Sequence, residues 1–387
     1  MRWAWTGLGL LAVFLAPWVQ VPATNFSGWD EWLVVNLTSR GVLNLPYENR
    51  PFSLLFNLPG ALLLPFTLAG FWLVHAGYVV LAGALTSWLV RRLGVEDARI
   101  AFMAGAFAVS FAPLDAMRLD VVLLANYSGA AFAVVLVLAL LVEAERRADD
   151  KLALLAGLLG FMAIRSLESS AALLAAAPLL PLMAMPAKAG RLRRALLYAF
   201  FFGVGLALAV RPLLPGQAAS YQVSGLGFDP HPGRLLGRMA QLLALHLAPL
   251  VRFVPAELGR LSVLVAVAAF LAVWSRLGMP DRGDDASTWR RPLLVGVAGA
   301  VLAMAVLALS PANVTPWRTQ ILSAPFVGMA LAAGLGGLAR WKPGRALCPL
   351  LAGWVVAIGA SRVLAMQADW DRLSYWPRQS GCLRQLA

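Results

Sequence analysis

Apolar stretches of about 20 residues recur from one end of this chain to the other. Each is long enough to cross the hydrocarbon core of a bilayer as a helix, because that core is about 30 Å thick. The stretches lack the alternation of apolar and polar residues that membrane β-strands need. The pattern therefore predicts an all-α bundle of transmembrane helices and excludes a soluble domain.

The composition agrees with this interpretation. Hydrophobic residues make up 60% of the 387 positions and charged residues 13%, whereas soluble domains are about 45 to 50% apolar and about 25% charged. A cleaved signal peptide is an alternative for the first apolar stretch, although Val21-Pro22-Ala23 fits a cleavage site poorly. We expect about eleven spans, at 4–22, 69–90, 98–114, 126–142, 152–165, 168–186, 195–211, 259–275, 293–309, 320–339 and 347–363.

The basic residues predict the orientation. A net charge of +13 would suggest a nucleic-acid partner in a soluble protein, but in membrane proteins Lys and Arg gather in cytoplasmic loops. With the N-terminus inside, the basic loops all fall on the cytoplasmic side: Arg91-Arg92, Arg146-Arg147, 188–194, Arg290-Arg291 and 340–345. We therefore expect an integral protein of a bacterial inner membrane, with its C-terminus outside and no nucleic-acid partner.

The stretch from Lys151 to Pro186 is ambiguous, because Arg165 and Glu168 lie in its middle. It is either one span with a buried ion pair or a short hairpin whose tip lies outside. A single span would turn every later basic loop outward, so the charge rule favours the hairpin. Arg165 is costly near hydrocarbon, which indicates either a function or pairing with Glu168, and the sequence leaves both open.

Two outer loops, at about 22–68 and 212–258, are too long for simple turns within a transmembrane domain of residues 1–363. A short outer tail, 364–387, follows. The second loop contains an amphipathic stretch that predicts a helix in the plane of the membrane surface. Its polar residues are Arg234, Arg238 and Gln241, and its apolar ones are Leu235, Met239, Leu242 and Leu243.

The first outer loop begins with a predicted interfacial helix. Ser27 could cap it and Gly41 could end it, with Asp30 and Glu31 in its first turn. The helix dipole alone favours carboxylates there, so this position does not by itself imply catalysis. Neighbouring helix residues point about 100° apart, so only one of the two carboxylates can face a given cavity.

The same loop continues with Tyr47-Glu48-Asn49-Arg50-Pro51. An acidic pair followed by a tyrosine and a basic residue before proline resembles the membrane glycosyltransferases of the GT-C class, above all the protein O-mannosyltransferases and the lipid A aminoarabinose transferases. The likeness covers the first 90 or so residues, and the later spans only by topology. The chain departs from the pattern at Phe52, where a second proline is usual, and it lacks a large outer C-terminal domain.

The resemblance implies site residues. Asp30 would activate or position the acceptor, and Arg50 would hold the donor phosphate. Beyond the resemblance, Tyr47 and Arg165 are further candidates to bind the phosphate, and Glu31, Asp115 and Asp120 are candidates on the acceptor side. Asp115 and Asp120, with Arg118 between them, could instead solvate a loop.

The chemistry is consistent with these roles. A donor sugar on a polyprenyl phosphate leaves behind a phosphate whose charge needs fixed cations, and the acceptor hydroxyl needs a carboxylate base. We therefore expect an inverting glycosyltransferase whose partners are this donor, membrane lipid and an acceptor glycan, lipid or protein. The alternatives are a transporter or flippase of a lipid-linked glycan, which should show internal repeats that this sequence lacks, and a non-catalytic assembly subunit.

The histidines give little support for a cofactor. His75 lies within an apolar span and is expected to be a hydrogen-bonded interior side chain. His231 follows Asp229 and Pro230, and one such pair is a weak signal for a divalent metal. No cofactor is therefore predicted, and a metal stays an unsupported alternative.

Overall fold

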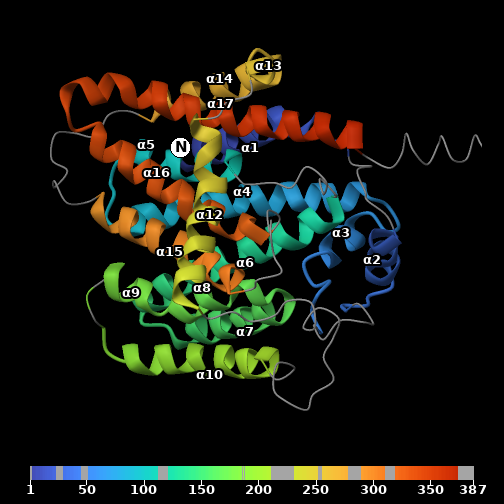
Figure 1. Cartoon of the computed structure of the whole chain (residues 1–387). Helices are drawn as coiled ribbons and strands as arrows, with labels where there is room; N and C mark the ends of the chain where they lie inside the picture. The colour runs from blue at the N-terminus through green and yellow to red at the C-terminus, as the bar shows by residue number, and fades with distance from the viewer. Residues whose placement is uncertain are drawn as a thin grey trace, which may run out of the picture.

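The computed structural model describes residues 2–22, 29–44, 51–111, 121–184, 186, 188–210, 231–251, 255–277, 289–309 and 319–373. All regular elements in these ranges are helices, so the all-α prediction is confirmed. Figure 1 shows most of the long helices lying side by side, with α12 running across them.

Each expected span coincides with helical structure. The counterparts are α1 (Arg2–Trp18), α4 (Ala69–Arg92), α5 (Ala98–Ser110), α6 (Val121–Arg147), α7 (Asp150–Ser166), the broken segment η2 (Glu168–Ser170), α8 (Ala171–Ala176) and α9 (Leu179–Ala184), then α10 (Arg191–Val210), α14 (Leu261–Arg276), α15 (Arg290–Ala308), η4 (Thr319–Ser323) with α16 (Ala324–Leu338), and α17 (Lys342–Leu373). By length and composition, six helices of the described part could cross a membrane: α4, α6, α10, α15, α16 and α17. The chain is an integral membrane protein.

Close contacts between helices fix the directions of the bundle. His75 and then Tyr78 of α4 contact Ser128 and then Phe132 of α6, so α6 runs parallel to α4. A Cβ on Gly336 would lie 2.6 Å from Ile100, which places the end of α16 at the start of α5. These directions bring the basic loops together at one end of the bundle, which we call the basic end: Arg91-Arg92, Arg146-Arg147, 188–194, Arg290-Arg291 and 340–345. The opposite end is called the site end.

The stretch from Lys151 to Pro186 is a hairpin, as the charge rule predicts. The backbone N–H of Lys188 donates to Glu145 Oε1 over 3.0 Å, so the chain returns to the end from which α7 departs. Halfway back, Tyr198 on α10 donates its hydroxyl to the carbonyl of Leu174 over 2.6 Å. The returning half is interrupted between α8 and α9, because Pro178 has no backbone N–H to continue the hydrogen bonding of α8.

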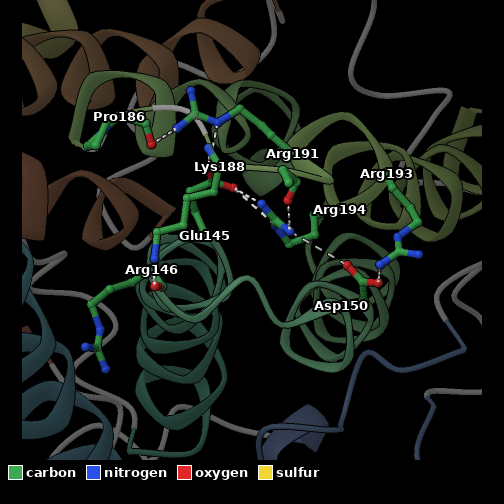
Figure 2. A network of polar contacts seen from close by, with 9 residues as sticks. Glu145, Arg146, Asp150, Pro186, Lys188, Arg191, Arg193 and Arg194 are labelled. Carbon is green, nitrogen blue, oxygen red and sulfur yellow. Dashed lines mark hydrogen bonds and ion pairs between the residues drawn. The ribbon is translucent and has the colours of Figure 1, made fainter.

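A network of charges fastens this hairpin at the basic end (Figure 2). Glu145 Oε1 accepts from Arg191 Nε over 2.8 Å, and Glu145 Oε2 accepts from Arg194 Nη2 over 2.7 Å. Arg194 also lies 3.9 Å from Asp150, which pairs with Arg193. The side chains of Glu145 and Arg194 are each only 4% exposed, so α6, α7 and α10 meet around a buried ion pair.

The two helices expected in the outer loops are also present. In the first loop α2 spans Trp29–Ser39, and Gly41 ends it with a φ of +79°, the left-handed geometry that favours glycine there. In the second loop α12 spans Pro232–Val251. Its residues Leu235, Met239 and Leu242 pack on Met304, Leu307 and Ala308 of α15.

The face of α12 differs in part from the prediction. Leu243, expected on the buried side, is 41% exposed, because α15 covers only the stripe from Leu235 to Leu242. Arg238, expected on the polar side, donates to the carbonyl of Ala308 over 3.1 Å at the end of α15. The arginine therefore helps to hold α12 across the bundle.

The orientation can be tested with single cysteines. Native Cys382 lies in the C-terminal tail, and Ala189 is exposed at the basic end. If the charge rule holds, a membrane-impermeant maleimide should label Cys382 from outside intact cells. Ala189→Cys, in a Cys382→Ser background, should react only after the cells are opened. Labelling of both positions from the same side would contradict this topology.

Candidate active site

The predicted site residues lie mostly in or beside segments that the structure does not describe. Tyr47 and Arg50 lie outside the described residues, and so do Asp115 and Asp120. For Asp30 and Glu31 the helical backbone of α2 is described, without their side chains. Arg165 is described fully. The neighbouring described residues show which of these segments lie together.

The helix that carries Asp30 and Glu31 is packed against the start of α6. Val34 and Val35 of α2 belong to one buried cluster with Val121 and Val122 of α6. Positions 30 and 31 lie one turn before Val34 and Val35 on the backbone of this helix.

The segment that follows Arg50 is anchored to the same helix. Buried Asn57 donates its side-chain N–H to the carbonyl of Val122 over 2.7 Å. The hydroxyl of Tyr78 donates to the carbonyl of Phe56 over 3.2 Å. A Cβ on Gly129 would lie 2.4 Å from the Cβ of Phe56, so only glycine lets α6 approach this closely.

A second contact joins this segment to the hairpin tip. The ring of Phe52 lies 6.1 Å from that of Phe161 on α7, in an edge-to-face arrangement. Phe161 lies about one helical turn before Arg165, and Phe52 lies two positions after Arg50. The contact therefore joins the described segment that begins at Pro51 to the last turns of α7.

Arg165 is half-buried in the last turn of α7, where burial disfavours its cation and the negative charge of Glu168 offsets this only in part. Arg165 can therefore both interact with Glu168 and have a function. A carboxylate can hold a guanidinium in position without occupying all of its five N–H donors. The arginine lies in a partly buried polar tip rather than on an exposed surface loop.

Two further polar residues in this tip, Ser166 and Ser169, are not among the site residues predicted from the sequence. The hydroxyls of Ser166 and Ser169 are buried, and neither has a hydrogen-bond partner in the described part of the chain. Ser170, in contrast, donates to the carbonyl of Leu167 over 2.7 Å. An unpaired buried hydroxyl costs about 1 to 3 kcal/mol, so Ser166 and Ser169 are candidates to hydrogen-bond a water molecule or a polar ligand group. The only sequence signal was three serines within five residues of Arg165.

The two buried histidines are structural. His75 Nδ1 lies 3.0 Å from Ser128 Oγ, and its ring contacts Phe14 and Trp18, which confirms the expected interior role. His246 on α12 lies 2.5 Å from Ser323 Oγ. Burial, with a smaller effect of Arg362, lowers the pKa of His246 to about 3, so it is neutral at physiological pH.

No group of three or more His, Cys, Asp or Glu side chains converges in a metal-binding arrangement among the residues described. Asp229 of the weak Asp-Pro-His motif lies outside them, and His231 is exposed. The metal alternative therefore gains no geometric support from the described part.

Comparison with known proteins gives similarity at the level of structure alone. No family model matches the chain, and no curated protein does. ArnT from Cupriavidus metallidurans in the apo state aligns with 96% of this chain and 78% of its own, at 15% identity and a TM-score of 0.45. The oligosaccharyltransferase of Archaeoglobus fulgidus, in complex with Zn and sulfate, aligns with 93% of this chain at 17% identity and a TM-score of 0.46.

These neighbours are GT-C glycosyltransferases. This chain spans about half the length of the archaeal enzyme, 53%. With TM-scores below 0.5 and identities of 15% and 17%, the roles of individual residues depend on this chain's own contacts.

Proposed function

We propose that this protein is an inverting glycosyltransferase that moves a sugar from a polyprenyl-phosphate donor to an acceptor hydroxyl at the site end. Asp30 is the base or the group that positions the acceptor. Arg50 and Arg165 bind the donor phosphate, with Tyr47 beside them, and Glu31, Asp115 and Asp120 support the acceptor side. The donor lies in the outer leaflet of the bacterial inner membrane.

One observation carries the proposal most directly. The contact between Phe52 and Phe161 joins the segment that begins at Pro51 to α7, whose last turn carries Arg165. The hydrogen bond from Asn57 to Val122 ties the same segment to the start of α6, against which α2 packs. These contacts support a site in which Arg50, Arg165 and the acidic pair of α2 act together.

The reaction needs few groups. Asp30 takes the proton of the acceptor hydroxyl as the oxygen attacks the anomeric carbon of the sugar. The bond from that carbon to the phosphate oxygen breaks, and the polyprenyl phosphate leaves with the electron pair. Arginine stabilises the growing charge because its planar fork can donate two hydrogen bonds to phosphate. Direct displacement from the opposite side inverts the anomeric centre.

Donor binding provides a test that does not depend on the acceptor. Arg50→Ala and Arg165→Ala should each weaken binding of polyprenyl phosphate to the purified protein by roughly 10- to 100-fold, since a charge-assisted hydrogen bond is worth about 1.5 to 3 kcal/mol. Arg50→Lys should recover only part of the loss, because a point charge cannot replace a bidentate fork. The measurement is a binding titration in detergent.

Arg40 provides the matched control. It is an exposed arginine just beyond α2 in the same loop, so Arg40→Ala should leave the affinity nearly unchanged. If Arg50→Ala and Arg165→Ala also bind the lipid normally, neither arginine belongs to a donor site, and the proposed function loses its phosphate clamp.

A further inference from the structure

Three arginines at the basic end lie over tryptophan rings of neighbouring helices. Arg91 of α4 lies 5.5 Å from the ring of Trp3 on α1, and Arg276 of α14 lies 5.6 Å from that of Trp5. Arg99 of α5 lies 5.4 Å from the ring of Trp274 on α14. We call these six residues the Arg–Trp cluster. It joins α1, α4, α5 and α14 where these helices begin or end.

The helices are packed closely enough to make the cluster one surface. A Cβ on Gly9 of α1 would lie 2.8 Å from Val273 of α14 and 3.0 Å from Phe102 of α5. Trp3 and Trp5, two residues apart on α1, therefore bring the guanidinium groups of Arg91 and Arg276 to opposite flanks of the same short segment.

The arginines of this cluster differ from those of the hairpin network at the same end. Around the hairpin, guanidinium groups pair with Glu145 or Asp150. Among the residues that the structure describes, no carboxylate pairs with Arg91 or Arg276. Asp97, close to Arg99 in sequence, accepts the backbone N–H of Arg99 as a helix cap. The positive charge of the cluster is therefore not neutralised by a described ion pair.

The ring contacts leave the N–H groups of these guanidinium groups available to bind an anion. An aromatic ring takes the face of a guanidinium, whereas the N–H groups point outward from its edge. Those edges match phosphate oxygens in geometry and charge. Each of the two guanidinium groups, Arg91 beside Trp3 and Arg276 beside Trp5, can therefore bind a phosphate without first breaking a described ion pair.

The surroundings of the cluster favour a phospholipid as the source of this phosphate. Trp3 and Trp5 are 48% and 43% exposed, as expected for tryptophans at the level of lipid headgroups. Farther along α1, Leu8 is 58% and Leu11 40% exposed. An acyl chain can pack along these residues while its headgroup stays at the arginines.

We propose that Arg91 and Arg276 each bind the headgroup phosphate of an anionic phospholipid from the leaflet at the basic end, and that the exposed side of α1 binds an acyl chain. The site is separate from the proposed donor site, which lies at the opposite end of the bundle. Bound lipid at this site would contact α1 together with α4 or α14.

The test is retention of phosphatidylglycerol by the full-length protein in detergent, measured by native mass spectrometry. The double variant Arg91→Gln/Arg276→Gln should reduce the apparent affinity for this lipid by about tenfold or more, since each basic residue near an anionic lipid contributes about fivefold. Arg91→Lys/Arg276→Lys should retain intermediate affinity, and this variant serves as the test if the glutamine variant does not fold.

The control variant also removes two positive charges from the basic end. Arg146→Gln/Arg147→Gln changes two arginines that already pair with Glu143, and it should retain phosphatidylglycerol almost as wild type does. An equal loss in this control would show a general attraction of the basic end and overturn the specific site. Unchanged retention in both glutamine variants would also overturn it, as would displacement of the lipid by inorganic phosphate at the same arginines.

Discussion

Glu145→Ala should lower the stability of the protein by about 3 to 5 kcal/mol, because it leaves Arg194 buried without its carboxylate. Glu145 accepts hydrogen bonds from Arg191, Arg194 and the backbone of Lys188, which come from the segment that closes the hairpin and begins α10. The expected result is a lower unfolding temperature in detergent and faster proteolysis near residues 186–194. This network stabilises the packing of the bundle and lies away from the proposed active site.

Glu143 is the matched control for this prediction. It lies two residues earlier on the same helix, where it pairs with Arg146 and Arg147, whose side chains are 42% and 59% exposed. Exposed ion pairs are screened by water and salt, so Glu143→Ala should change the unfolding temperature little. Equal, small effects of the two substitutions would show that the Glu145 pair is not a structural clamp.

A double variant distinguishes the loss of the ion pair from the cost of leaving Arg194 buried without a carboxylate. Replacing both partners of a buried ion pair by apolar residues is often close to neutral, whereas removing one partner is costly. Glu145→Leu/Arg194→Met should therefore be more stable than Glu145→Ala, although Arg191 still loses its acceptor.

The membrane helices could be predicted from the sequence because lipid imposes a simple requirement on length and polarity. The boundaries of the helices were less predictable. α17 continues to Leu373, past the boundary expected at 363, because its last turns no longer need to be apolar. There the side-chain amide of Gln367 donates to Asp371 over 2.8 Å, an interaction within the helix that a hydropathy pattern does not register.

The contacts that position the site region could not be predicted, because they join residues far apart in the chain. Phe52 occupies the position where the GT-C pattern usually has a second proline. From the sequence alone it could only be described as a difference from that pattern. In the structure its ring contacts Phe161 and links the first outer loop to the hairpin. The partners of Glu145 are similarly more than 40 residues away from it. Only the three-dimensional packing shows such pairs.

Asp30→Asn should lower the turnover of sugar transfer by about 10² to 10⁴, the usual contribution of a positioned general base, while the protein keeps its fold. Asparagine has nearly the shape of aspartate and is a good residue near a helix start, but it cannot accept the acceptor's proton. The measurements are the transfer rate with a polyprenyl-phosphate sugar and, in parallel, the yield and unfolding temperature. Donor binding should be unchanged, which separates this variant from Arg50→Ala.

Glu31→Gln is the control that decides between the two carboxylates. Both belong to the first turn of α2, and Val34 and Val35, one turn later, both lie in the packed cluster against α6. The backbone position therefore favours neither, and the choice of Asp30 comes from the resemblance to GT-C enzymes. If Glu31→Gln abolishes transfer and Asp30→Asn does not, the two roles are reversed. If Asp30→Asn keeps its transfer rate but loses about 1 kcal/mol of stability, Asp30 serves only the helix dipole, and Asp115 or Asp120 becomes the next candidate base.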